Sequence, residues 1–321
     1  MPDIAVSATY YGYLASSLTS YVLRRRCSSF PLRIHLQTQT RCNARCAMCP
    51  HPDVSRAWTH GTMDWALYDD IARQIGEAAG PRTVVFDLQN EPLLNEGIFS
   101  WILHMKRRAP HARCVLITNG ALLHRYALAD IEASRVDLIA VSLNAHTLET
   151  YARLNCGLEF DLVRENILRL AEVPALKTKL RVDFVETREN ERELDAATSF
   201  WRTHGVRVYR KPLSNRASAL ECYDDLTAQR PGRPGPFKSL RRGLRRRVGC
   251  PLPFYQMSIL QDGTAILCCH DWNHACVLGT VGEQSIAEIW NSPALQRIRG
   301  ALLSGHAERV VPCAECSLAR R

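Results

Sequence analysis

From residue 32 onward, short apolar runs alternate with longer segments in which apolar residues recur every three to four positions. The first pattern is typical of buried strands and the second of amphipathic helices. The runs predict strands at residues 34–38, 83–88, 114–118, 138–143, 180–185 and 206–209. The longer segments predict helices at residues 64–79, 98–108, 122–133, 148–154, 162–171 and 193–204. This alternation predicts an α/β fold with a parallel sheet. Because a closed TIM barrel takes eight strands, the six units predict a partial (β/α)6 TIM-like barrel.

Polar residues share one face of the first two predicted strands. Residues two apart in a strand point to the same side of the sheet. The polar set comprises His35, Gln37 and Gln39 on the first strand and Asp87, Gln89 and Glu91 on the second. A polar face in a buried sheet predicts a lumen that can hold a polar substrate, although each side chain can equally bond to a nearby loop. In such barrels the chemistry gathers at the C-terminal strand ends.

The pattern changes after the predicted barrel. Residues 231–236 read Pro-Gly-Arg-Pro-Gly-Pro, and an Arg-rich run follows at 241–247, so the alternation stops there. We therefore divide the chain into an N-terminal extension (1–31), a barrel (32–212), a basic linker (213–248) and a small cysteine-rich domain (249–321). In the last of these, Asp262-Gly263 predicts a hairpin between residues 256–260 and 264–267. Short helices are predicted at residues 285–290 and 293–303.

Composition narrows the classes of function. No apolar run reaches the roughly 18 residues of a membrane helix, and the N-terminus lacks the order of a secretory signal, so we expect a cytoplasmic protein without membrane contact. The chain has 41 Lys and Arg against 32 Asp and Glu, a formal charge of +9. Clustered arginine is typical of a solvated basic face, or of a surface that attracts a phosphorylated substrate, RNA or an acidic carrier. Thirteen cysteines without an export signal indicate metal or redox chemistry rather than disulfides.

The first predicted strand leads directly into Cys42, Cys46 and Cys49, a CxxxCxxC loop. Each iron of a 4Fe–4S cube normally takes one thiolate, so three cysteines leave the fourth iron open to a substrate or cofactor. By spacing alone, a zinc site or a ferredoxin-like cluster with a distant fourth ligand also fits.

This loop, placed after a first barrel strand, resembles the signature of the radical SAM superfamily. Segments after the second, third and fourth predicted strands match that family in order: Asn90-Glu91-Pro92, Thr118-Asn119-Gly120, and Ser142 with Asn144. The resemblance implies a 4Fe–4S cluster on the three cysteines that binds S-adenosylmethionine (SAM). It also implies that one electron cleaves SAM to a 5′-deoxyadenosyl radical, which takes a hydrogen atom from the substrate.

The resemblance also assigns SAM contacts. Glu91 corresponds to the family's Gly-Glu-Pro segment, which holds the methionine amino group, although Asn90 stands here in place of the usual glycine. Asn119 belongs to the family's Thr-Asn-Gly turn. Ser142 and Asn144 match positions that face the carboxylate and ribose, and Met48 matches a residue that packs on adenine.

A second cysteine group comprises Cys250, Cys268, Cys313 and Cys316. Four thiolates can wrap one fully ligated 4Fe–4S cube, although a zinc site is the alternative and the adjacent Cys269 could replace Cys268 as the ligand. The segment resembles the C-terminal SPASM and twitch domains of radical SAM enzymes: it shares the Asp262-Gly263 turn, Cys268-Cys269-His270-Asp271, Leu278-Gly279, Ile286 to Trp290 and the final CxxC. The longer SPASM type has further cysteines that this chain lacks, which favours the one-cluster twitch type.

The resemblance implies a function near that of aminoglycoside or aminocyclitol epimerases and dehydrogenases. We therefore expect epimerisation or two-electron oxidation at a carbinol C–H of a sugar-like substrate, with electrons from a flavodoxin or ferredoxin. Cys269 and Cys276 are candidate catalytic residues, because a thiol can return a hydrogen atom to the opposite face. For the deprotonation that oxidation requires, His35, Asp87 and Arg210 are candidates by strand parity. A maturase of ribosomally made peptides is the alternative, and a non-catalytic iron–sulfur or zinc protein that binds RNA a remote one; nucleic acid is not an expected partner.

Overall fold

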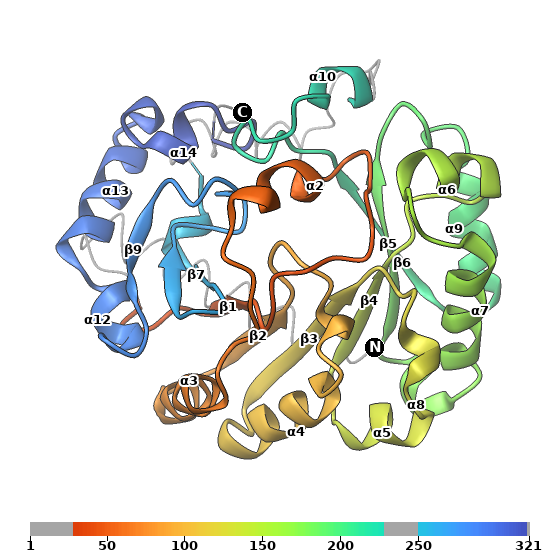
Figure 1. Ribbon diagram of the computed structural model, residues 1–321, viewed down its shortest axis with the longest axis horizontal. Coiled ribbons are helices and arrows are strands. Elements are labelled where there is room, and N and C mark those ends of the chain that lie inside the picture. Colours follow the sequence, from red (N-terminus) through yellow and green to blue (C-terminus); the bar gives the residue numbers. More distant parts are fainter. Residues whose placement is uncertain (1–27, 228–249, 320–321) are drawn as a thin grey trace.

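The computed structural model describes residues 28–227 and 250–319, which form one mostly parallel sheet with helices packed on its outer face (Figure 1). The sheet has nine strands in the order β6-β5-β4-β3-β2-β1-β7-β8-β9. Six strands follow the predicted barrel: β1 (Arg33–Leu36), β2 (Arg82–Phe86), β3 (Ala112–Thr118), β4 (Leu138–Ser142), β5 (Leu180–Glu186) and β6 (Arg207–Pro212). The C-terminal part adds β7 (Gln256–Ile259), β8 (Thr264–Ile266) and β9 (Val277–Thr280).

Helices connect the parallel strands and bury their apolar faces against the sheet. The longer ones are α3 (Trp65–Glu77), α4 (Ile98–Arg108), α7 (Phe160–Ala171), α9 (Leu194–Thr203) and α13 (Pro293–Leu303). The shorter ones are α2 (His51–Val54), α5 (Leu128–Ala133), α6 (Leu148–Leu154), α8 (Pro174–Lys177), α10 (Tyr223–Leu226), α12 (Ile286–Trp290) and α14 (Val311–Ala314). In α3 the Asp64 carboxylate caps the first turn by accepting from the Ala66 and Leu67 N–H groups. Ile34 and Leu36 of β1 join the apolar core on this helical side.

The partial barrel predicted from the sequence is confirmed. β1 to β6 pair in parallel and in sequence order, and β6 and β9 form the two edges of the sheet, so the barrel is not closed. The C-terminal part extends the sheet, because β7 pairs in parallel with β1, with Ile34 opposite Met257. This pairing joins distant segments of the chain and leaves no local pattern from which to predict it.

The predicted hairpin is also present, as the antiparallel pair β7 and β8. Its turn requires glycine: Gly263 has a φ of +88°, and a Cβ there would lie 2.5 Å from the Val281 carbonyl oxygen. Strand β9, which pairs with β8, was not predicted. It is short, half-exposed and interrupted by Gly279, so its apolar pattern is weak.

The predicted division into domains falls partly outside the described residues, and some residues near its boundaries are buried. The first 27 residues and residues 228–249, including the arginine run at 241–247, lie outside the described residues. Residues 213–227 were predicted as linker, but Leu213 and Leu220 are buried in an apolar cluster, so this part packs on the barrel. Phe30, predicted as part of the N-terminal extension, is likewise buried in the core.

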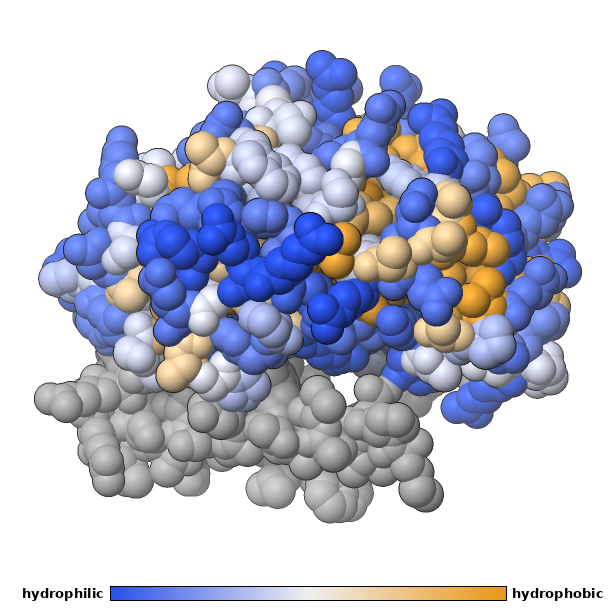
Figure 2. Space-filling model, turned by 90° about the horizontal axis from the view of Figure 1, so that it is seen from below, coloured by the Kyte–Doolittle hydropathy of each residue, from blue (hydrophilic) through white to orange (hydrophobic). Residues whose placement is uncertain are grey.

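The described part of the molecular surface is mainly polar on the face that Figure 2 draws. The face drawn in Figure 2 is largely hydrophilic, with apolar residues gathered toward one side. Scattered exposed hydrophobic side chains are normal in folded proteins. Among the described residues, the large exposed ones are Trp65, Leu148, Tyr209, Val277 and Val311. Among the helices that the structure describes, none has both the length and the hydropathy of a membrane span.

Candidate active site at the carboxyl ends of the strands

The three cysteines of the CxxxCxxC loop lie together, directly after β1. The Cys49 N–H donates to the Cys46 carbonyl at 3.0 Å, and the loop is fixed to the segment after α6 by the Arg45 N–H, which donates to the Cys156 carbonyl at 2.8 Å. Burial raises the pKa of Cys42 to about 12, with the Glu91 charge and Cys49 adding to the effect. Burial and the neighbouring thiols also raise the pKa of Cys46. A metal cluster would reverse this preference, because it binds thiolates and releases their protons.

The donor set fits a 4Fe–4S cluster. Within residues 28–227 and 250–319, no three His, Cys, Asp or Glu side chains converge closely enough to hold a single metal ion. A cube does not require that convergence, because each thiolate binds a different iron. Three half-buried thiols on one loop, with no fourth cysteine in the motif, are the set that leaves one iron available to SAM.

Glu91 joins the ends of β2 and β3. Its carboxylate is buried and accepts from the Thr118 hydroxyl at 2.5 Å, the Asn119 N–H at 2.8 Å and the Leu93 N–H at 3.0 Å. Burial raises the pKa of Glu91 to about 7, while these three donors hold it lower than burial alone would. The Asn119 amide then donates to the Asn43 side chain at 2.8 Å, which ties both strand ends to the cysteine loop.

Asn90 supplies an observation that favours a bound polar group at this point. Its side-chain oxygen and nitrogen are both buried and have no hydrogen-bond partner within the part of the chain that the structure describes. Buried amides are normally hydrogen-bonded, so an unpaired one next to Glu91 fits the predicted contact with the methionine end of SAM. The preceding residues Leu88 and Gln89 have φ values of +87° and +62°, which are strained for residues with side chains.

The other predicted SAM contacts also lie at strand ends. Asn144 follows β4, and its side-chain oxygen accepts from the Val185 N–H at 2.9 Å. Ser142 is the last residue of β4 and is half-buried. Met48 is buried against Leu154, Val185, Leu213 and Leu220, which form an apolar wall beside the cysteine loop.

The four C-terminal cysteines, far apart in sequence, lie within electrostatic reach of one another. All four are buried: Cys250, Cys268, Cys313 and Cys316. Burial raises the pKa of Cys268, and Cys250 and Cys313 are among the charged neighbours that raise it further. Cys250 and Cys316 act in the same way on Cys313. Cys276 also lies within electrostatic reach of Cys313 and packs against the apolar core.

Cys269 points away from the four-cysteine group. Its sulfur accepts from the Gln256 amide at 3.4 Å, and it packs beside Leu88. Burial raises the pKa of this thiol, and the charge of Asp87 raises that pKa further. The hydrogen bond from Gln256 acts in the opposite direction and lowers the pKa. The adjacent cysteines 268 and 269 therefore lie in two different environments, and the Cys269 thiol faces the polar side of the sheet.

The polar face predicted from strand parity is present. His35 and Asp87 meet across β1 and β2, with 2.7 Å between the histidine Nδ1 and the carboxylate. On β5, the Arg181 guanidinium donates two hydrogen bonds to the Asp183 carboxylate, from Nε at 2.5 Å and from Nη2 at 2.9 Å. His270, next to Cys269, pairs with the Ser214 hydroxyl at 3.2 Å. These pairs line the inner face, opposite the helical core.

Arg210, the third residue predicted for proton transfer, lies on the wrong face. It forms ion pairs with Glu186 at 3.2 Å and with the exposed Asp195 at 2.7 Å. The register explains this: Arg210 pairs with Phe184, which belongs to the helical core, so both point outward. Its neighbour Lys211 takes the inner position instead, 3.7 Å from Asp183.

Sequence reasoning missed several residues of this site. Lys211 and Arg216 were overlooked because they follow the last predicted strand, whose end was placed too early, and His270 was named only as part of the segment that resembles SPASM domains. Cys222 lies beside the cysteine loop and donates to the Ala47 carbonyl at 3.2 Å. No sequence spacing connects Cys222 with that loop.

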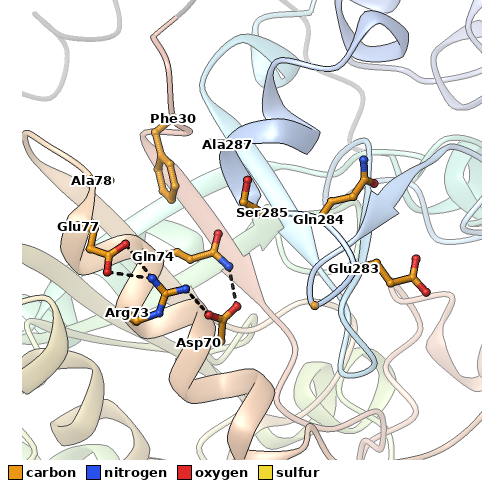
Figure 3. A pocket seen from close by; sticks show the side chains of 11 residues that line it. Phe30, Asp70, Arg73, Gln74, Glu77, Ala78, Glu283, Gln284, Ser285 and Ala287 are labelled. Carbon is orange, nitrogen blue, oxygen red and sulfur yellow. Dashed lines mark hydrogen bonds and ion pairs between the residues drawn. The ribbon is translucent and has the colours of Figure 1, made fainter.

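A surface pocket of about 460 Å³ lies elsewhere, between α3 and the turn before α12 (Figure 3). Arg73 is ion-paired there with Asp70 and Glu77, and Gln74 also bonds to Asp70, so the polar groups that Figure 3 shows on α3 satisfy one another. None of the predicted ligands lines this pocket. We therefore place the candidate active site at the strand ends.

Comparisons with known proteins agree with this geometry. Residues 36–191 match the radical SAM superfamily, and residues 250–317 match SPASM, an iron–sulfur cluster-binding domain. The S-adenosyl-L-methionine-dependent 2-deoxy-scyllo-inosamine dehydrogenase of Niallia circulans is 22% identical over 284 residues, which are 88% of this chain and 92% of that enzyme.

Solved structures share the fold. BtrN in complex with AdoMet and 2-DOIA superposes with a TM-score of 0.62 at 20% identity, covering 89% of this chain and 92% of that one. SuiB of Streptococcus suis, bound to its precursor peptide SuiA, has a TM-score of 0.68 at 14% identity, covering 95% and 74%. The predicted cofactors, SAM and iron–sulfur clusters, are confirmed by the two family matches. The chain therefore belongs to the radical SAM superfamily and carries a C-terminal SPASM iron–sulfur domain.

Proposed function

We propose that this protein epimerises a carbinol stereocentre of a sugar-like or aminocyclitol substrate, with Cys269 as the hydrogen-atom donor. The single observation that carries the proposal is the placement of Cys269, whose thiol accepts from Gln256 and lies within electrostatic reach of Asp87, the partner of His35. When bound, SAM and the cluster on Cys42, Cys46 and Cys49 supply a 5′-deoxyadenosyl radical, which removes the carbinol hydrogen.

The polypeptide then determines the outcome. The Cys269 S–H bond breaks homolytically. The released hydrogen atom forms a C–H bond with the substrate carbon from the opposite face, and this inverts the stereocentre. The sulfur is left one electron and one proton short of the thiol. A reductant of the flavodoxin or ferredoxin class supplies the electron, and solvent supplies the proton. Gln256, which donates to the sulfur at 3.4 Å, orients the side chain throughout.

Two-electron oxidation at the same carbon is the second candidate. It is favoured by the dehydrogenase of Niallia circulans, which spans nearly the whole chain, and by the His35–Asp87 pair, which can accept a hydroxyl proton. In this reaction the substrate radical loses an electron instead of gaining a hydrogen atom. Cys269 argues against it, because a thiol within reach would quench the radical first.

Deuterium incorporation separates the two reactions. The holoenzyme is incubated anaerobically with SAM, reductant and 2-deoxy-scyllo-inosamine or related cyclitols in heavy water, and the product is weighed by mass spectrometry. Epimerisation adds one deuterium, because the thiol exchanges with solvent. A product that has lost two hydrogens and gained no deuterium would refute epimerisation and identify a dehydrogenase.

Variants assign the donor. Cys269→Ala should still form 5′-deoxyadenosine but incorporate no deuterium at the stereocentre. Cys276→Ala is the matched control, because that thiol packs against the apolar core and should leave incorporation unchanged. Turnover of a precursor peptide, with none of any cyclitol, would favour a peptide maturase instead.

A further inference from the structure

Two cationic side chains at the inner end of β6 lack hydrogen-bond acceptors. The ammonium of Lys211 is 3.7 Å from Asp183, which is beyond hydrogen-bond distance, and Asp183 already accepts two bonds from Arg181. The Lys211 side chain is 33% exposed, so part of it is open to an incoming group. Arg216, five residues later, has no ion pair or side-chain hydrogen bond within residues 28–227 and 250–319, and its Nε is buried.

Arg216 is held in place by an unusual backbone. Arg216, Ala217 and Ser218 have φ values of +51°, +53° and +70°, so three consecutive residues with side chains occupy the left-handed region. Such strain persists only where the surroundings impose it, and it gathers at functional sites. Here the SPASM domain imposes it: the Asn215 amide donates to the Glu315 carbonyl at 2.6 Å, and the Asn215 N–H donates to the Ser317 hydroxyl at 3.1 Å.

This turn places Arg216 between the two cysteine groups. Its charge acts on Cys49 of the first group and on Cys269, beside the second. It also lies within electrostatic reach of His270, as His35 and Lys211 do. Burial lowers the pKa of Lys211, Asp183 opposes this, and Arg216 adds to it. Positive charges therefore crowd the space in which a substrate would sit.

The two carboxylates that act on Lys211 offset only part of this positive charge, because each already has a partner. Asp183 is engaged by Arg181, and Asp87 is paired with His35. A buried charged donor without an acceptor, such as the Arg216 Nε, is costly, which makes a bound anion favourable at this point. An ammonium group would be repelled from the same place.

We propose that Lys211 and Arg216 form a subsite for an anionic group of the substrate, a carboxylate or a phosphate. The inference rests on the proposed function, since it concerns the substrate of the same lumen. The subsite favours a substrate whose ring carries an acidic group, such as a uronic acid or a sugar phosphate. It disfavours a substrate that would place an amine next to Lys211 and Arg216. Guanidinium and ammonium donors from two directions match the several oxygens of such a group.

Ligand binding to the SAM-loaded holoenzyme tests the subsite independently of turnover. The probes are D-glucuronate, glucose 6-phosphate and neutral glucose, titrated anaerobically in a calorimeter. We expect at least one anionic probe to bind more tightly than glucose. Lys211→Gln and Arg216→Gln should each weaken that probe about tenfold to a hundredfold, the range typical of a hydrogen bond to a charged group, with little effect on glucose.

Two further variants guard against structural damage. Lys211→Arg keeps the charge and should retain most of the affinity for the anionic probe. Arg210→Gln is the matched control, because Arg210 is the neighbouring cation on the outer face and should leave every probe unaffected.

Three results would overturn the subsite. One is a wild-type protein that binds no anionic probe more tightly than glucose. Another is loss of affinity in Arg210→Gln equal to that in Lys211→Gln. The third is a weakened affinity for SAM in both Gln variants with unchanged probe affinity, which would assign the cations to the SAM carboxylate. None of these results would refute the proposed epimerisation. That reaction is tested separately by deuterium incorporation, which a neutral ring can show as well as an acidic one.

Discussion

Replacing Glu91 by glutamine should make the stability of the protein less dependent on pH. Glu91 is almost fully buried, and its pKa rises from 4.5 in the unfolded chain to about 7 in the folded one. Between these values the native state binds more protons than the unfolded state, so stability falls as pH rises and the loss is complete above pH 7. From pH 5.5 to pH 8.5 this linkage removes about 2 kcal/mol from the free energy of unfolding.

The groups around Glu91 allow this pH dependence of stability to be assigned to Glu91 itself. Cys42 is the ionisable group that its charge affects most directly, and burial raises the Cys42 pKa to about 12, so Cys42 stays neutral across the range. The glutamine side chain of the Glu91→Gln variant would keep an acceptor for Thr118 and Leu93 but place an amide opposite the Asn119 N–H. We expect that lost bond to cost about 1 kcal/mol at all pH values. The variant should therefore be less stable at pH 5.5 and gain on the wild type as pH rises.

Urea unfolding of the protein without clusters or SAM, followed by tryptophan fluorescence at both pH values, measures the difference. Other groups titrate equally in both proteins and cancel. Glu96→Gln is the control, because Glu96 is exposed five residues later and should follow the wild type. An unchanged pH dependence in Glu91→Gln would refute the reasoning, since it would mean that Glu91 is ionised at pH 5.5 in the folded protein.

Three other substitutions address the cofactors. Cys46→Ala should abolish 5′-deoxyadenosine formation, measured by liquid chromatography, while Cys156→Ala, beside the same loop, should not; activity in Cys46→Ala would contradict the cluster assignment. Cys313→Ser should leave SAM cleavage largely intact and stop product formation, if the second cluster handles electrons, and unaffected turnover would exclude that role. Gln89→Ala should raise the Kd for SAM about tenfold, because Gln89 ties the strained loop after β2 to the Asp271 carbonyl of the SPASM domain at 3.1 Å; equilibrium binding with unchanged Kd would show that the loop holds its shape alone.

The barrel could be predicted because its strands and helices carry local signals. Each parallel strand has a buried apolar face that the next helix covers, so the period of apolar residues changes along the chain. Strand parity placed His35 and Asp87 on one face correctly, and the register of β1 and β2 brings them together. The cysteine loop was equally accessible, because three ligands on one short segment need no tertiary information.

The rest depends on contacts between distant segments. Parity failed for Arg210 because the predicted strand ended at residue 209, short of the observed end at Pro212, and only the pairing with Phe184 fixes which side faces inward. The pairing of β7 with β1 has no counterpart in sequence spacing. Arg216 is recognisable only from the left-handed turn that the SPASM domain imposes on it.

The adjacent cysteines 268 and 269 follow a strand that has just ended. Ile266, the last residue of β8, packs with Leu88 on the inner side, Leu267 joins the helical core, and the chain then leaves the sheet in a bend and a turn. Cys268 then reaches Cys250 and Cys313, whereas Cys269 returns to the inner side and meets Gln256. Because this turn, and not a strand, separates the two side chains, their division depends on the contacts that each makes after β8. One short segment can in this way contribute to both the proposed iron–sulfur site and the proposed substrate site.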